Sequence, residues 1–577
     1  MYKLSPVLSP TLLQIIEWVE SYTDTALTSA QVPGTSESER RHLMALGGVA
    51  MAIAEVNSHD WPMPIHNWMR SAPTLPENLA TALRVELRRD NTGLGVLYEQ
   101  IVSGRNRRRL GTFFTPPEIV SFLFDCADGL VKNPGTIIDP GAGVGAITLA
   151  ARDHWPLADI KAVDINVVTL GLLAAQCALE KVANVNLILE DFLSWILALE
   201  KTNEHCRLII GNPPYTRHQD LASEVHRQHR QAIGPAVTNG LTGLSTYFLA
   251  ASLRSLNPSD CLVFVLPGNW TEANYGLAIR KALLSQTHRS IKLYSFPLNT
   301  NVFPGTNVST LVLSIGPQQS VEQSITVASA EIKGRKVEIG QIKEIDRSDE
   351  TAKNLGRLLW GRAWSPLRST SRTTTLAEIG RIRRGSATGA NNFFFLKDIE
   401  AKNLPSKALV PGIVRVGHVG GMVLDMRAHN RIGFRGERRW LLYLTDSKLL
   451  ADDRIKDVIE QGEQAGLHLR YLTSHRKPWY LVEQVSPPHI LLGTMAKGHL
   501  QAVYNHVQAI PSNAVYGIYL DRNPSIAPKL TTWLNSSAGQ QSLHMVGRTY
   551  SGGLHKLEPR DLLSIQIPCI EELLSPE

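Results

Sequence analysis

The chain has 577 residues, of which 43% are hydrophobic and 19% are charged. This composition is typical of folded proteins and excludes a disordered or fibrous chain, and the length predicts about three domains. The net charge of +7 and the isoelectric point near 9.0 are compatible with a polyanionic partner but do not establish one.

The cysteines are scattered, with no Cys-x-x-Cys pair and no histidine cluster at metal-ligand spacing. We therefore expect a reduced protein without a metal site. The segment from Met1 to Thr11 has no charged start followed by an apolar core and a cleavage site, and no run of about 18 apolar residues occurs elsewhere. These features predict a cytoplasmic protein without a membrane segment.

Residues 1–105 are predicted to be a helical N-terminal region. Apolar residues recur at three- and four-residue steps from Leu12 to Val19 and again from Leu43 to Ile53. Gly, Ser and Pro between residues 32 and 38 separate the two patterns. Packing is favoured over catalysis as the role of this region.

Residues 106–350 alternate short apolar runs with stretches of helical periodicity. The expected strands are 136–138, 160–163, 185–189, 207–210, 261–266, 291–294 and 310–315. This rhythm predicts an α/β, Rossmann-like catalytic domain with a mostly parallel sheet covered on both faces, and ligands of such sheets bind at the carboxyl ends of the strands.

The C-terminal part has a different pattern. Residues 317–360 are polar and rich in lysine, which indicates the last strands of the catalytic domain followed by a connector. Residues 360–577 contain short strand-like runs, turns and many Arg, His and aromatic residues without an α/β rhythm. They predict a separate, mixed α+β domain.

A glycine-rich loop follows the first predicted strand, in the sequence Ile137-Ile-Asp-Pro-Gly-Ala-Gly-Val-Gly-Ala146. Glycines such as Gly141 and Gly143 let a loop turn sharply and bring its backbone against a ligand. The spacing differs from the G-x-G-x-x-G of dinucleotide enzymes, and the Lys-Ser/Thr pair of a phosphate-binding P-loop is missing. A zwitterionic nucleotide such as S-adenosylmethionine therefore fits better than NAD or ATP.

Acidic residues end the next two predicted strands. Asp164 lies where a carboxylate can accept hydrogen bonds from both hydroxyls of a ribose. Asp191 and Phe192 follow the third strand and offer a carboxylate to an adenine amino group and a ring to its face. Acidic groups at consecutive strand ends strengthen the prediction of a nucleotide cofactor.

The most specific motif is Asn212-Pro213-Pro214-Tyr215, directly after an apolar strand. The lone pair of an aromatic amino group is delocalised into its ring, so the nitrogen is a poor nucleophile. The Asn212 side-chain carbonyl and the Pro213 backbone carbonyl can accept both amino hydrogens and localise that lone pair. Two prolines fix these acceptors, and Tyr215 can stack on a base that has been flipped out of a duplex.

These motifs resemble those of the gamma group of amino-methyltransferases, the TaqI-like N6-adenine DNA methylases. In that family a further motif precedes the glycine loop, as Gly111-Thr-Phe-Phe-Thr-Pro-Pro-Glu118 does here. The resemblance implies that Thr115, Pro116, Asp139 and Gly141 lie at the methionine end of S-adenosylmethionine, with Asp164 at the ribose and Asp191 and Phe192 at the adenine.

The resemblance extends to later segments. Asn299-Thr-Asn-Val-Phe-Pro304 is similar to a family loop that carries a second aromatic ring for the flipped base, which implies this role for Phe303. Arg383 to Phe393 and Ser551 to Lys556 look like parts of target-recognition domains. Arg383, Arg384, Lys497 and the run from Arg105 to Arg109 are candidate DNA contacts, each equally explained as surface charge.

The sequence thus predicts a site-specific, adenine-specific DNA methyltransferase that binds S-adenosylmethionine and double-stranded DNA and acts as a monomer. From the resemblance alone, it would protect DNA against a separately encoded cognate restriction endonuclease. N4-methylation of cytosine remains an alternative, because it poses the same amino-group problem. Methylation of a glutamine amide in a release factor, and a DNA-binding subunit with a vestigial pocket, are weaker alternatives.

Overall fold

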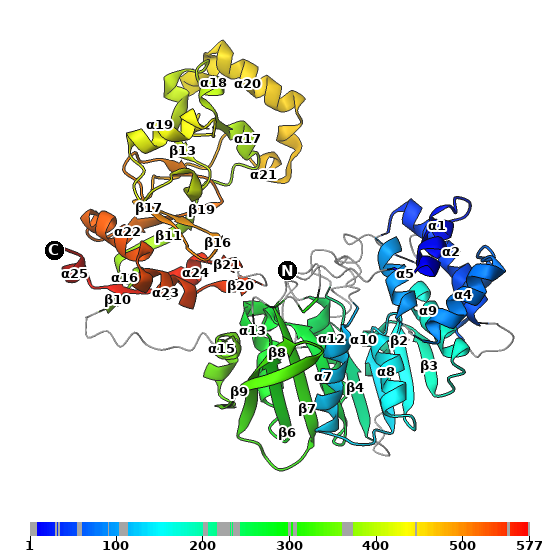
Figure 1. Ribbon diagram of the computed structural model, residues 1–577. Helices are drawn as coiled ribbons and strands as arrows, with labels where there is room; N and C mark the ends of the chain where they lie inside the picture. Colours follow the sequence, from blue (N-terminus) through cyan, green and yellow to red (C-terminus); the bar gives the residue numbers. More distant parts are fainter. Residues whose placement is uncertain are drawn as a thin grey trace. The chain divides into compact units, whose positions relative to one another are not determined.

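The computed structural model describes residues 8–28, 32, 35–54, 61–89, 92–102, 114–199, 206–215, 231, 233–234, 243–297, 300, 302–303, 309–360, 373–444, 447–550 and 554–574. The chain divides into two compact units, Met1–Ala363 and Trp364–Glu577. In Figure 1 the first unit runs from blue to green and the second from yellow-green to red.

A nine-stranded sheet in the order β3-β2-β1-β4-β5-β7-β6-β8-β9 is the centre of the first unit. Its strands are β1 (Thr136–Pro140), β2 (Asp159–Asp164), β3 (Val185–Leu189), β4 (Arg207–Gly211), β5 (Cys261–Pro267), β6 (Arg289–Ser295), β7 (Thr310–Gln318), β8 (Ser324–Lys333) and β9 (Lys336–Asp346). Every strand expected from the sequence lies within one of the first seven. Strands β1 to β5 are parallel, as predicted, but β7 runs antiparallel between β5 and β6, and β9 is antiparallel to β8, so the sheet is mixed.

Helices cover both faces of this sheet (Figure 1). One core contains α7 (Pro117–Asp128) and α8 (Ala146–His154), and a second core contains α10 (Phe192–Ala198), α12 (Leu244–Ser255), α14 (Leu277–Leu284) and α15 (Asp349–Leu359). The alternating apolar side chains of the strands explain the two layers: Ile137 packs into the first core and Ile138 into the second. The first unit continues through α15, beyond the boundary at residue 350 that the composition suggests.

The N-terminal region is helical, with α1 (Pro10–Glu20), α2 (Glu37–Ala54), α3 (Met63–Arg70), α4 (Glu77–Leu87) and α5 (Gly93–Ile101). These helices share one hydrophobic core with α9 (Val167–Leu179). Trp68 is buried against Gly171, where a Cβ atom would lie 2.3 Å from the ring, and Trp68 Nε1 donates a hydrogen bond of 3.0 Å to the Leu43 carbonyl. The region is therefore built into the first unit next to the glycine loop.

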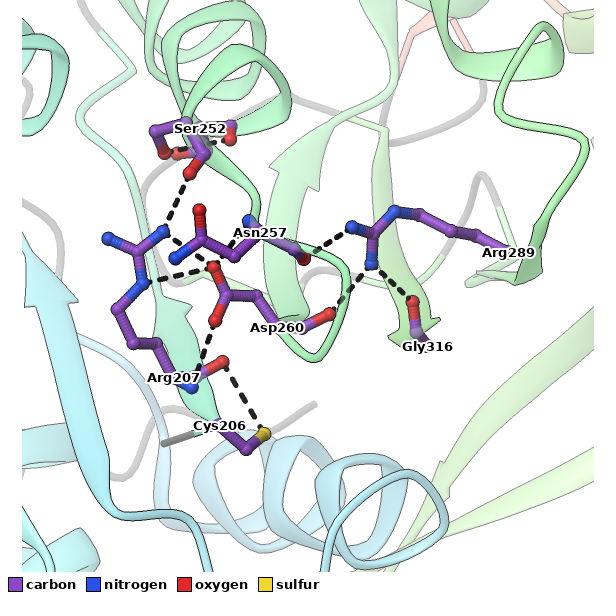
Figure 2. A network of polar contacts seen from close by, with 8 residues as sticks. Cys206, Arg207, Ser252, Asn257, Asp260, Arg289 and Gly316 are labelled. Carbon is purple, nitrogen blue, oxygen red and sulfur yellow. Dashed lines mark hydrogen bonds and ion pairs between the residues drawn. The ribbon is translucent and has the colours of Figure 1, made fainter. Parts of the chain in front are cut away.

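A buried ionic network fixes the amino-terminal ends of the central strands (Figure 2). Asp260 is fully buried and accepts hydrogen bonds of 3.0 Å from both the backbone nitrogen and Nε of Arg207, the first residue of β4. Arg289, at the start of β6, donates to the carbonyls of Asp260, Asn257 and Gly316 at 2.6–2.9 Å. The network ties together strands whose opposite ends carry the candidate site.

The second unit mixes small sheets and helices, as the sequence predicts. Its sheets have the orders β11-β19-β15-β17, β12-β14-β13-β18, β16-β21-β20 and β10-β22. The strands are β10 (Thr373–Thr375), β11 (Gly380–Arg384), β12 (Phe395–Leu396), β13 (Leu409–Ile413), β14 (Trp440–Leu442), β15 (Ile490–Gly493), β16 (Met495–Lys497), β17 (Ala502–Tyr504), β18 (Ile510–Pro511), β19 (Val515–Leu520), β20 (Arg548–Tyr550), β21 (Leu554–Lys556) and β22 (Gln566–Pro568).

The longer helices of this unit are α19 (Met426–Phe434), α20 (Asp453–Gln464), α22 (Ala527–Asn535) and α23 (Ser537–Met545). The unit also contains the short helices α17 (Asn391–Phe394) and α21 (Tyr471–Ser474). Among the helices that the structure describes, none has the length and apolar character to cross a membrane.

Candidate active site

The glycine loop between β1 and α8 is held against the end of β2. The backbone nitrogens of Gly141 and Ala142 donate to the Val163 carbonyl at 2.8 and 3.1 Å. Gly141, Gly143 and Gly145 have φ of +74°, +58° and +90°, a region that side chains with a Cβ rarely adopt. The loop is a short turn whose conformation depends on its glycines.

Asp164 connects this loop to α9. Its Oδ2 accepts a hydrogen bond of 2.8 Å from the Gly143 backbone nitrogen, and its Oδ1 accepts one of 2.8 Å from the backbone nitrogen of Asn166. Burial raises the pKa of Asp164, and these backbone donors oppose the shift. The carboxylate therefore has a fixed orientation at the carboxyl end of β2, where the sequence predicts a ribose contact.

Asp139 lies near the end of β1 and is almost fully buried. Thr148 Oγ1 donates a hydrogen bond of 2.7 Å to its Oδ2. Burial raises the pKa of Asp139 to about 7, and the negative charge of Asp164 adds to the increase. A cation bound beside these two carboxylates would lower that pKa, so the pair favours a positively charged ligand.

The Asn212–Tyr215 segment lies directly against the glycine loop. A Cβ atom on Gly141 would lie 3.4 Å from the ring of Pro214, and one on Gly211 would lie 2.7 Å from Pro140. Pro213 is buried. The turn after β4 and the loop after β1 are thus neighbours, as the sequence predicts for a cofactor site and a catalytic motif.

A hydrogen bond of 3.2 Å from Asn212 Nδ2 to Thr115 Oγ1 joins the Asn212–Tyr215 motif to the motif that precedes the sheet. Thr115 is buried, and Pro116 caps the N-terminal end of α7. Gly111, Thr112 and Phe113, the beginning of that motif, lie outside the described residues. The structure therefore brings Thr115 and Pro116 to the predicted site.

The two aromatic rings predicted for a flipped base are in contact with each other. The ring centroids of Tyr215 and Phe303 are 5.5 Å apart, with an interplanar angle of 82°. Phe303 is 1% exposed. Because the rings meet edge to face, a base can lie between them only after one of them moves. The rest of the predicted Phe303 loop, apart from Thr300 and Val302, lies outside the described residues.

Asp191 and Phe192 have evident structural roles. Asp191 is the N-cap of α10 and accepts hydrogen bonds from the backbone nitrogen and hydroxyl of Ser194 at 3.1 and 2.8 Å. Phe192 is 2% exposed and stacks on Phe248, with centroids 4.8 Å apart. A contact of either residue with an adenine ring stays a prediction.

Sequence reasoning missed the contribution of α5 to this site. Tyr98 is buried, and its hydroxyl accepts a hydrogen bond of 3.3 Å from Asn166 Nδ2, next to Asp164. Gly95 packs against Val144 of the glycine loop and against Phe114, which precedes Thr115. Tyr98 belongs to an ordinary helical pattern, so no feature of the sequence singles it out.

The predicted DNA contacts are found in the second unit, except for 105–109, which lies outside the described residues. Arg383 and Arg384 are exposed on β11, and Arg384 lies over the ring of Tyr516 with its Cζ 5.8 Å from the centroid. Lys497 is exposed on β16, and a contact of these side chains with DNA stays a prediction. Across the described residues, no group of three or more His, Cys, Asp or Glu side chains is arranged to hold a metal ion.

Two protein-family models match parts of this chain. Residues 175–303 match the Eco57I restriction-modification methylase family, and residues 362–576 match the C-terminal domain of the type II methyltransferase M.Eco57I. The type II methyltransferase M.XamI of Xanthomonas campestris pv. amaranthicola is 26% identical over 503 residues, which cover 83% of this chain and 88% of that protein.

Two further proteins are similar along most of the chain. The type II methyltransferase M.AccI of Acinetobacter calcoaceticus is 23% identical over 493 residues, 81% of this chain and 86% of that protein. The structure of the type IIL restriction-modification enzyme MmeI in complex with DNA aligns with 96% of this chain and 82% of its own, with a TM-score of 0.59 and 15% identity. The likeness to MmeI concerns the fold.

Proposed function

We propose that this chain, a relative of the Eco57I-like type II restriction-modification methyltransferases, methylates N6 of an adenine flipped out of duplex DNA and uses S-adenosylmethionine as the methyl donor. One observation carries the proposal: the Asn212–Tyr215 motif adjoins the predicted cofactor site. Asn212 is hydrogen-bonded to Thr115, and Pro214 lies against Gly141 of the glycine loop. A polar motif for an aromatic amino group therefore adjoins a loop suited to a nucleotide.

The donor set fits S-adenosylmethionine. When bound, this cofactor supplies an electrophilic methyl group on a positively charged sulfonium. Asp139 and Asp164 place two carboxyl groups beside a loop with positive φ angles at Gly141 and Gly143, and a bound sulfonium would favour their ionised forms. Thr115 and Pro116 would lie with Asp139 at the methionine end, Asp164 would hold the ribose, and Asp191 and Phe192 would contact the adenine.

Asn212 and Pro213 would activate the target amino group. The Asn212 amide is anchored through its nitrogen, so its oxygen is the atom that it presents to an N–H donor. Together with the Pro213 carbonyl, this oxygen would accept both amino hydrogens and concentrate the lone pair on the nitrogen. The nitrogen needs no prior deprotonation, because it becomes acidic only as it gains the methyl group.

Tyr215 would stack on the flipped base. Burial raises the pKa of Tyr215 well above its ordinary value, so its hydroxyl stays neutral and does not act as a base. Stacking on an aromatic ring contributes about 1 to 3 kcal/mol per base, which offsets part of the cost of unstacking. Phe303 would supply the second ring after it moves away from the edge of Tyr215.

We assign sequence recognition to the second unit, and we propose that the chain acts as a cytoplasmic monomer alongside a separately encoded endonuclease. The match of residues 362–576 to the C-terminal domain of M.Eco57I supports the division of catalysis and sequence recognition between the two units. The division also disfavours the release-factor alternative, because that activity gives no reason for a second unit of this size.

The decisive experiment is single-molecule sequencing of genomic DNA from cells that express the wild-type chain or Asn212→Ala. The expected result is N6-methyladenine at one position of a short motif, absent in the variant. Asn403→Ala, which changes an exposed amide in the second unit, is the matched control and should methylate like the wild type. N4-methylcytosine would correct the base, and unmodified DNA from wild-type cells would refute the proposal.

A further inference from the structure

A loop of the second unit is joined to helix α21. The loop comprises residues 385–390 between β11 and α17, within the segment Arg383 to Phe393 that resembles part of a target-recognition domain. At Gly389, where φ is +77°, a Cβ atom would lie 3.0 Å from the Leu472 side chain. Arg476 Nη2 donates a hydrogen bond of 2.5 Å to the Ala387 carbonyl, and Arg470 Nη1 donates one of 3.5 Å to the Gly389 carbonyl. The loop and α21 therefore form one surface.

Large side chains are exposed on this surface. Tyr471 is 79% exposed, Leu469 is 74% exposed, and the Tyr471 ring lies 4.7 Å from that of His475. The buried Thr473 Oγ1 donates to the backbone carbonyls of Leu467 and Arg470 and so fixes the turn that presents them. A rigid turn that exposes an aromatic ring and a leucine is suited to contact with a partner.

Two amide side chains are oriented beside the same loop. Asn391 Nδ2 donates a hydrogen bond of 3.3 Å to Asn513 Oδ1, and the buried Thr388 Oγ1 donates one of 2.6 Å to Asn391 Oδ1. Asn513 is exposed. Amide side chains in fixed positions read the edges of bases in a groove, because each offers both a donor and an acceptor.

The charge of this surface is positive. Arg470 and Lys477 are exposed, and within the part of the chain that the structure describes neither makes an ion pair with a carboxylate. An arginine, an exposed aromatic ring and oriented amides suit duplex DNA, which offers phosphates and base edges together. An apolar protein partner would not need the cation or the amides.

We infer that the surface formed by Asn391, Arg470, Tyr471 and Asn513 contacts duplex DNA and helps to determine the sequence that is methylated. This inference rests on the proposed function. Arg470 contacts a phosphate and sets the position of the duplex. Asn513, held by Asn391, hydrogen-bonds to a base edge, and Tyr471 packs against the groove.

The test measures binding of the full chain to two duplexes by fluorescence anisotropy at several salt concentrations. One duplex contains the methylated motif and the other a scrambled sequence. Arg470→Ala should weaken binding to both by about tenfold and lower the slope of log K against log salt by about one. Lys402→Ala removes an exposed positive charge elsewhere in the unit and should leave binding unchanged.

The role of the Asn513 amide is tested by measuring the sequence specificity of DNA binding. Asn513→Ala should weaken binding to the motif duplex by about tenfold, spare the scrambled duplex and relax one position of the motif in sequenced genomic DNA. Tyr471→Ala should weaken binding to both duplexes. Phe434→Ala, which removes a ring that is 90% exposed, is its control.

Cofactor affinity, measured by calorimetry, separates this inference from the proposed function. Variants that bind cofactor normally but bind DNA as described support the inference. If the wild type methylates DNA and all three variants bind and methylate like it, the inference is overturned. If the wild type methylates nothing, the proposed function fails, and the response of Arg470→Ala with the scrambled duplex still tests the contact with DNA.

Discussion

Asn212 Nδ2 donates a hydrogen bond of 3.2 Å to Oγ1 of Thr115, a residue 97 positions earlier in the chain. This bond joins the end of β4 to the segment that leads into α7. It fixes the rotation of the Asn212 amide, and the direction of the amide oxygen decides whether a target amino group can be polarised. Thr115 is thus placed to position Asn212, in addition to the cofactor contact proposed for it.

Thr115→Val should lower kcat about fivefold, because loss of one orienting hydrogen bond costs roughly 1 kcal/mol and leaves the amide free to rotate. The measurement is transfer of a radiolabelled methyl group to DNA at saturating cofactor. Thr115→Ser keeps the hydroxyl and should retain most of the activity. Equal rates for the valine variant and the wild type would remove the positioning role.

Tyr215→Phe should keep kcat/KM within about threefold, because the neutral phenol contributes its ring to stacking. Tyr215→Ala should lower kcat/KM by about 5- to 150-fold, since stacking worth about 1 to 3 kcal/mol is lost. Fluorescence of 2-aminopurine at the target position reports the stacked state directly. A large loss in the phenylalanine variant would mean that the hydroxyl takes part in the reaction.

Asp139 should make cofactor affinity depend on pH. Burial raises its pKa to about 7, and a positively charged cofactor binds better to the ionised carboxylate. Affinity should therefore increase between about pH 6 and pH 8, with release of a proton that calorimetry in buffers of different ionisation enthalpy detects. Asp139→Asn should bind more weakly and without this slope, and the same slope in the variant would exclude Asp139 as its source.

The same carboxyl affects the stability of the cofactor-free protein. Its pKa is about 7 in the folded chain against an ordinary value of 3.8, so the folded state binds a proton that the unfolded state releases. The contribution of Asp139 to the free energy of unfolding is therefore fully present below about pH 4 and is lost as the pH rises to about 7. Thermal unfolding of the wild type and Asp139→Asn across this range measures the difference.

The strands and the glycine loop were predictable because their signals are local. The apolar residues of a strand such as Arg207–Gly211 lie within a few positions of one another, and so do the glycines that follow Asp139. The antiparallel direction of β7 was not predictable, because an apolar run has the same composition in either direction. The predicted domain boundary at residue 350 falls in the first turn of α15, because the burial of this helix against the sheet depends on tertiary packing.

The candidate site also has features that the sequence predicts and features that it does not. The residue types of the Asn212–Tyr215 motif indicate their chemistry, and the structure brings them to the loop that the sequence predicts. The hydrogen bonds between Asn212 and Thr115 and between Asn166 and Tyr98 join segments that are far apart in the chain. They therefore cannot be inferred from a single sequence. The burial of Phe192 against Phe248 likewise follows from packing between helices.

Gly145→Ala should destabilise the protein more than Gly334→Ala does, although both residues have positive φ. At Gly334, with φ of +64°, a Cβ atom would have no neighbour within 4 Å, so alanine there adds only backbone strain of about 1 to 2 kcal/mol. At Gly145, with φ of +90°, a Cβ atom would lie 2.3 Å from Leu173 Cδ1 in the buried core. Relief of that overlap requires a shift of α8 or of Leu173 and should add about 1 to 3 kcal/mol. Calorimetric unfolding of both variants measures the difference, and equal destabilisation would show that Leu173 moves aside at no cost.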